Sequence, residues 1–292
     1  MKIILGSAQF GLDYGINNNV GKPSDVDLKS ILDRAQTEGI RLLDTAENYG
    51  DAQRRIGDYH KKCGKKFEVI TKFSSSLEIM PTSFRERIVN DIKILDIDSL
   101  YGYLFHSFDD FNSYFRRFES ELLQLKCDGL IKRLGVSLYT NDELERVLEF
   151  DNVDLIQIPY NLLDNASKRN EVLIKAKRKA IEIHTRSPFL QGLLFKSSSE
   201  LKGDLVQARP YLVEIDRISR QNNISIGELA ISYCMANANI DNVVLGVDSV
   251  RQVTEISKWA KESLTKRMTD MIDQVNVKEE SLLNPSTWIQ KY

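Results

Sequence analysis

The sequence predicts an α/β protein, a single closed barrel of eight parallel β/α units. Short apolar segments alternate with longer amphipathic segments along the whole chain, which is typical of parallel β/α units. Eight such units can be counted, and 292 residues suit one (β/α)8 (TIM) barrel, a fold that often occupies about 250 residues. A doubly wound sheet is the rival, but the G-x-G-x-x-G turn of its dinucleotide-binding form and the Lys-Ser/Thr of a P-loop are missing.

The predicted elements follow in chain order. Strands are expected at 3–7, 41–44, 67–72, 100–106, 132–137, 153–158, 180–186 and 242–246. Helices are expected between them at 24–38, 81–95, 112–126, 141–150 and 164–179. Several of these helices open on Ser, Asn or Asp, the residues that cap helix N-termini.

The last two units are less regular, with extra helices before and after the eighth strand. Helices are predicted at 210–221 and 225–236, then from Asp248 to about residue 261, with one more beyond. Long loops on a barrel rim tend to bind ligands. We treat 1–292 as one domain whose tail, 275–292, either lies over the barrel mouth or frays; fraying is favoured because termini usually fray.

Composition excludes several classes of partner. A net charge of −2 gives no excess for binding polyanions, so nucleic acid is not expected. The three cysteines, Cys63, Cys127 and Cys234, have no C-x-x-C spacing and are expected to be reduced and structural. No segment approaches the ~20 apolar residues of a membrane span, and the N-terminal apolar run is too short for a signal peptide. We therefore expect a cytoplasmic protein without membrane contact.

Polar side chains stand where the predicted strands end, the position at which barrel enzymes hold their catalytic groups. The eight strand-end positions are Gln9, Asp44, Lys72, His106, Ser137, Gln157, Arg186 and Gly246, and the first seven carry polar or charged side chains. Tyr49 follows Asp44 by five residues, so a carboxylate, an ammonium, an imidazole and a phenol would meet at one rim. This combination indicates proton transfer and no metal site, since the three histidines are scattered. The alternative is a structural Asp44–Lys72 pair beside a packed tyrosine, which His106 makes less favoured.

Ordered motifs give the chain a resemblance to the aldo-keto reductases along nearly its whole length. The motifs are LGSAQFG at 5–11, DTAENYG at 44–50, ITK ending at Lys72, LFH ending at His106, IKRLGVS at 131–137 and QIPYN at 157–161. The segments at 8–15 and 186–194 look like a bacterial branch often met among polysaccharide-related enzymes. The resemblance implies reduction of an aldehyde or ketone, with a sugar as one candidate, by NADPH or NADH, with NADPH slightly favoured.

The four motif residues have a physical logic for carbonyl reduction. A phenol with a pKa near 10 is still protonated at neutral pH, so Tyr49 is the expected proton donor. The Lys72 ammonium would lower its proton affinity, and Asp44 would keep that lysine charged and oriented. His106 would orient the carbonyl oxygen by a hydrogen bond.

Binding of the nicotinamide cofactor is implied by the resemblance alone. The implied contacts are Gln9, Ser137, Gln157, Arg186, Gly246, Ser249 and Arg251. Leu138 stands where the family has an amide-binding Asn, and Gln53 and Ile256 are further departures from the family pattern. Asp248 would repel a 2′-phosphate and Arg251 would attract one, so NADH and NADPH both stay open.

Arg186 replaces the aromatic ring that the family stacks on the nicotinamide. A planar guanidinium can stack on a ring. Its positive charge would disfavour the positively charged oxidised nicotinamide, so we expect the reduced cofactor to bind more tightly than the oxidised one. The alternative role for Arg186 is to bind an anionic group of the substrate.

The substrate pocket is expected at the rim loops, with Gln9, Phe10, Tyr14 and Phe189 as candidate walls. A catalytically silent barrel that binds cofactor or a partner is the alternative function. A lyase or isomerase is less favoured, because a lysine paired with an aspartate stays protonated and is a poor nucleophile. The sequence indicates no oligomeric state.

Overall fold

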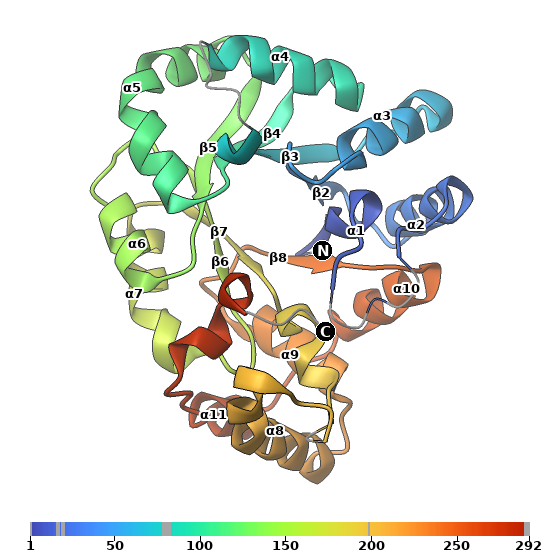
Figure 1. Cartoon of the computed structure of the whole chain (residues 1–292), viewed down its shortest axis with the longest axis vertical. Helices are drawn as coiled ribbons and strands as arrows, with labels where there is room; N and C mark the ends of the chain where they lie inside the picture. Colours follow the sequence, from blue (N-terminus) through green and yellow to red (C-terminus); the bar gives the residue numbers. More distant parts are fainter. Residues whose placement is uncertain (1, 16–17, 19–20, 78–82, 198, 289–292) are drawn as a thin grey trace.

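The computed structural model describes residues 2–15, 18, 21–77, 83–197 and 199–288 and forms a closed barrel of eight parallel strands. Each strand pairs with its neighbours in chain order, and β1 closes the barrel on β8 (Figure 1). The strands are β1 Ile3–Gly6, β2 Leu42–Asp44, β3 Glu68–Phe73, β4 Leu100–Phe105, β5 Ile131–Ser137, β6 Leu155–Pro159, β7 Glu182–Arg186 and β8 Asn242–Gly246. The predicted fold class is therefore confirmed.

Helices surround the barrel (Figure 1). The α-helices are α1 Ala8–Gly11, α2 Asp25–Thr37, α3 Ala52–Cys63, α4 Phe84–Leu95, α5 Phe108–Cys127, α6 Asn141–Val147, α7 Ala166–Arg178, α8 Arg209–Gln221, α9 Ile226–Ala236, α10 Val250–Trp259 and α11 Lys266–Asp273. Short 3-10 helices are η1 Ser75–Leu77, η2 Leu190–Phe195, η3 Gly203–Ala208, η4 Glu280–Leu283 and η5 Pro285–Thr287.

The predicted strands agree with the structure to within two residues, and the differences have local causes. Ala180, predicted to open the seventh strand, has φ +58°, a left-handed conformation that cannot continue a strand. Helix α5 starts four residues before the predicted position, because Ser107 Oγ accepts a hydrogen bond from the Asp110 N–H and caps the helix there. The predicted start of α4 at residue 81 lies outside the described residues.

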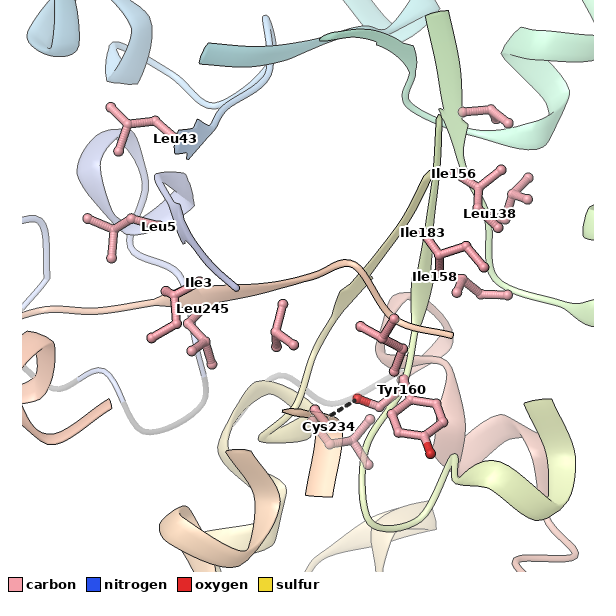
Figure 2. Close-up of a cluster of buried hydrophobic side chains, with 14 of the residues drawn as sticks. Ile3, Leu5, Leu43, Leu138, Ile156, Ile158, Tyr160, Ile183, Cys234 and Leu245 are labelled. Carbon is pink, nitrogen blue, oxygen red and sulfur yellow. Dashed lines mark hydrogen bonds between the residues drawn. The ribbon is translucent and has the colours of Figure 1, made fainter. Parts of the chain in front are cut away.

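Side chains on the outer face of the strands pack against the helices. Figure 2 shows Leu5, Leu43, Ile156 and Ile183 of this layer pointing away from the barrel interior, and all four are fully buried. At its lower end in the view, Cys234 Sγ of α9 donates a hydrogen bond to the Tyr160 carbonyl oxygen at 3.4 Å. This layer attaches the helices to the barrel.

A separate apolar cluster fills the barrel interior. Its members come from six strands: Ile4, Leu42, Ile70, Leu104, Leu155 and Val244. Side chains two residues apart on a strand share a face. The next inward-facing positions toward the carboxyl ends of β2, β3 and β6 are therefore Asp44, Lys72 and Gln157. These polar residues lie directly above the apolar interior cluster, which we call the interior plug.

The C-terminal segment returns to the barrel. Leu282 and Leu283 of η4 are buried, η4 contacts η3, and Pro285 reaches the cavity at the mouth. Within the described ranges, none of the helices has the length and apolar character needed to cross a membrane.

Candidate active site

Asp44 and Lys72 form a buried ion pair at the carboxyl ends of β2 and β3. Lys72 is 0% exposed, and its Nζ donates to Asp44 Oδ1 at 2.5 Å and to the Thr45 carbonyl oxygen at 2.9 Å. Gln157 Nε2 donates to the other carboxylate oxygen, Asp44 Oδ2, at 2.8 Å. Both carboxylate oxygens of Asp44 are thus hydrogen bonded, and these bonds fix the position of the Lys72 ammonium between β2 and β3.

Tyr49 is held by a turn that packs tightly on helix α1. A Cβ on Gly11 would lie 1.9 Å from the Tyr49 carbonyl oxygen, and one on Gly50 would lie 2.4 Å from the Gly11 carbonyl oxygen. Gly50 also has φ +56°, where side chains are disfavoured. The glycines of the two motifs therefore allow the backbone approach that brings the phenol to the mouth.

Glu47 anchors the same turn from its outer side. Its backbone N–H donates to the Lys72 carbonyl oxygen at 3.1 Å, and its carboxylate accepts a hydrogen bond from Tyr103 Oη at 2.8 Å and pairs with Arg87. The turn that carries Tyr49 is thus attached to β3 and β4.

The Tyr49 ring contacts both other polar groups of the site. Lys72 Nζ lies 5.3 Å from the Tyr49 ring centroid, and the Tyr49 and His106 rings meet edge to face with centroids 5.5 Å apart. The structure thus brings all four predicted catalytic residues, Asp44, Tyr49, Lys72 and His106, into one cluster.

The electrostatics of the cluster keep the phenol protonated and the imidazole neutral. Burial, and next the negative charge of Asp44, raise the pKa of Tyr49, while the cation of Arg186 lowers it. Burial lowers the pKa of His106 to about 3, with the charges of Lys72 and Arg186 acting in the same direction. Burial lowers the pKa of Lys72, and Asp44 opposes that shift. The site therefore offers a neutral acid, Tyr49, and a neutral hydrogen-bonding group, His106.

A cavity of about 680 Å³ opens above this cluster. Of the predicted cofactor contacts, its lining contains Gln9, Ser137, Gln157, Arg186 and Gly246. Ser249 and Arg251 do not line it: Ser249 caps α10, and Arg251 is 85% exposed and paired with Glu255. The Leu138 side chain is fully buried in the core, so it makes no contact in place of the family's Asn.

Several lining residues were not found by the sequence reasoning. Gln252, Glu255, Ile256 and Trp259 form one face of α10, and Tyr139 follows β5. The i, i+3, i+4, i+7 spacing was available as a signal for a common helix face. The sequence did not reveal which face of α10 turns toward the cavity.

The rim loop after β7 has an unusual backbone. Ser187, Leu190 and Gln191 have positive φ without being glycine, and Ser187 and Gln191 line the cavity together with Tyr14, whose hydroxyl accepts a hydrogen bond from Gln191 Nε2 at 3.1 Å. Positive φ in such residues is concentrated at functional sites. Of the predicted walls, Gln9, Tyr14 and Phe189 line the cavity, and Phe10 is buried in the core instead.

The size and the lining of the cavity suit a small-molecule ligand. Its volume lies within the range of small-molecule sites, and its lining includes both the cluster at Tyr49 and the α10 face at Glu255. Three buried polar atoms of lining residues, Ser7 Oγ, His106 Nδ1 and Asp248 Oδ1, have no hydrogen-bond partner among the described residues. Gln157 gives its amide N–H to Asp44, so its carbonyl oxygen is the group that can accept from a carboxamide. A phenol beside a buried ammonium at the mouth of a barrel, under a cavity of this size, suits an oxidoreductase that uses a nucleotide cofactor.

Comparison with known proteins agrees with this class. The model of the aldo/keto reductase family matches residues 2–277. An NADH-specific methylglyoxal reductase from Escherichia coli is 24% identical, over 87% of this chain and 91% of its own. A D-threo-aldose 1-dehydrogenase from a Pseudomonas species is also 24% identical, over 87% of this chain and 90% of its own. A solved aldo-keto reductase from Bacillus halodurans in its holo form superposes with a TM-score of 0.76 at 19% identity, covering 96% and 94% of the two chains.

The chain belongs to the aldo/keto reductase family. It is accordingly an NAD(P)-dependent oxidoreductase that acts on carbonyl compounds.

Proposed function

We propose that this enzyme reduces an aldehyde or ketone to an alcohol with Tyr49 as the proton donor. The reduced nicotinamide, when bound, supplies the hydride. Tyr49 then gives its phenolic proton to the carbonyl oxygen, and the buried Lys72–Asp44 pair supports the charge that remains on the phenol. Neutral His106 donates a hydrogen bond that orients the carbonyl. The observation that carries the proposal is the contact of the Tyr49 ring with both Lys72 and His106.

The test removes only the phenolic hydroxyl. In Tyr49→Phe, kcat should fall by roughly 10²–10⁴-fold, the usual contribution of a positioned acid, while the Kd for reduced cofactor changes little. Tyr211→Phe is the matched control, because Tyr211 is not a lining residue of the cavity and its hydroxyl donates a hydrogen bond to Glu279. Unchanged turnover in Tyr49→Phe would rule out this role, and a wild-type protein inert on a broad carbonyl panel would favour a cofactor-binding module.

We also propose that the enzyme prefers NADH to NADPH, against the slight family expectation. The α10 end of the cavity carries two carboxylates, Asp248 and Glu255, and its lining there includes no cation among the described residues. Arg251 is exposed and already paired with Glu255 at 2.8 Å. A 2′-phosphate would meet negative charge, whereas a ribose 2′-hydroxyl could donate a hydrogen bond to a carboxylate.

Fluorescence titration with both reduced cofactors tests this preference. We expect the Kd for NADH to be lower than the Kd for NADPH. In Glu255→Lys, the ratio of the two dissociation constants should move toward one or reverse. Glu262→Lys, the same charge change on an exposed residue outside the cavity lining, should leave the ratio unchanged. Equal constants for the two cofactors in the wild-type protein would exclude a selective role for these carboxylates.

A further inference from the structure

Arg186 is a cation on the cavity lining that has no ion-pair partner among the described residues. It is partly buried, and it is the single Lys or Arg on the cavity lining as far as the described residues extend. The ion pairs of the described residues include none with Arg186. The lining carboxylates are Asp44, Asp248 and Glu255, and two of these already pair with Lys72 and Arg251.

Neutral contacts hold the guanidinium in place. Its Nη2 donates to the Leu138 carbonyl oxygen at 3.1 Å, and its central carbon lies 4.1 Å from the Tyr139 ring centroid. One face of the guanidinium is therefore covered by an aromatic ring. The group is positioned without being neutralised, and a partly desolvated charge is normally paired.

The Arg186 cation lies at the end of the cavity that holds Tyr49 and His106. Arg186 ends β7, where it shares the lining with Tyr14, Tyr49 and His106. Its charge contributes to lowering the pKa of His106 and opposes the rise in the pKa of Tyr49. A substrate whose carbonyl lies beside Tyr49 therefore shares the cavity with the Arg186 guanidinium.

We propose that Arg186 binds an anionic group of the substrate, so that the preferred substrates are aldehydes or ketones that carry a carboxylate or phosphate. The planar fork of donors on a guanidinium matches both anions. Stacking on Tyr139 leaves the donor edge for the anion. This inference rests on the proposed carbonyl reduction, and its tests separate the two.

The first test compares aldehydes that differ mainly in charge. One pair is 4-carboxybenzaldehyde and 4-methylbenzaldehyde, and the second is D-glyceraldehyde 3-phosphate and D-glyceraldehyde. We expect kcat/KM to favour the anionic member of at least one pair by roughly 10- to 100-fold, the factor expected for a hydrogen bond to a charged group. The pair with the larger Arg186-dependent ratio identifies the anion as carboxylate or phosphate.

Three variants assign the preference to this side chain. Arg186→Met should abolish the anion preference, Arg186→Lys should keep part of it, and the exposed control Arg220→Met should retain it in full. NADH dissociation constants are measured on the same samples. A preference that is absent in the wild type, or that survives in Arg186→Met, overturns the proposal. So does an Arg186→Met defect confined to NADH binding, which would make Arg186 a cofactor contact.

A binding measurement keeps the anion site testable if no turnover is found. 4-(Hydroxymethyl)benzoate is titrated calorimetrically into the cofactor-free protein, with 4-methylbenzyl alcohol as the neutral comparison. Tighter binding of the anion that is lost in Arg186→Met supports the site even where the reductase proposal has failed. Equal binding of both compounds, or equal binding by both proteins, overturns it.

Discussion

Replacing Asp44 by Asn removes the countercharge of the most deeply buried cation in the site and keeps the side-chain shape. Lys72 is 0% exposed, and its Nζ lies 2.5 Å from Asp44 Oδ1. Removing one partner of a buried pair leaves an uncompensated charge and typically costs about 3–5 kcal/mol. Lys72 can escape this cost by losing its proton.

That escape sets an upper limit on the loss of stability. Neutralising a lysine with an unfolded-state pKa of about 10.4 at pH 7 costs roughly 4.6 kcal/mol, at about 1.36 kcal/mol per pKa unit. The expected decrease in the free energy of unfolding at pH 7 is therefore between about 3 and about 4.6 kcal/mol. Because a lysine that is neutral when folded binds its proton on unfolding, the deficit should shrink as pH rises toward 10, by at most about 1.4 kcal/mol per pH unit.

Urea unfolding of four proteins measures these quantities: wild type, Asp44→Asn, Lys72→Met and the double variant, each at pH 7 and pH 9. The double variant has no buried charge at either position, so it should be more stable than Asp44→Asn. All three variants should lose reductase activity. The reasoning is refuted if Asp44→Asn loses less than about 1 kcal/mol, if its deficit does not change with pH, or if the double variant is no more stable than the single one.

Four further predictions concern the His106 imidazole and two glycines. Since burial lowers the pKa of His106 to about 3, kcat/KM should stay flat between about pH 5 and 8; a limb near pH 6.5 would contradict a neutral imidazole. Because the pKa of His106 is lower in the folded than in the unfolded protein, its contribution to the free energy of unfolding is complete above about pH 6.5 and is lost as pH falls toward 3. In His106→Gln, the free energy of unfolding should therefore fall less steeply with decreasing pH, by up to about 1.4 kcal/mol per pH unit. Gly57→Ala should destabilise the protein by about 1–3 kcal/mol, because its Cβ would lie 1.9 Å from the Ile94 carbonyl oxygen; a Tm equal to wild type would disprove that close packing. Gly246→Ala should weaken NADH binding with little change in Tm, because the added Cβ would lie 2.3 Å from Gln9 Nε2 and would displace the flexible end of that side chain. An unchanged Kd for NADH would show that Gly246 is not part of the cofactor site.

The sequence by itself determined the barrel and the grouping of the four proposed catalytic residues at its rim, because both follow from short-range periodicity and from where the strands end. Side chains alternate in a strand, so Asp44 and Lys72 lie two residues beyond the interior plug residues Leu42 and Ile70 and share their inward direction. All strands of a parallel barrel end at one rim, which brings His106 and Tyr49 to the same place.

Only the tertiary structure decided the environment of Arg186 and the charge at the far end of the cavity. Arg186 meets Tyr139 and the Leu138 carbonyl oxygen across 47 and 48 residues of sequence, a contact between the end of β7 and the segment that follows β5. Glu255 faces the cavity and Arg251 faces solvent because of the rotation of α10 about its axis. That rotation is set by burial of Val253 and Ile256 in the core, where α10 contacts α2 and α9, and neighbours in sequence do not encode it.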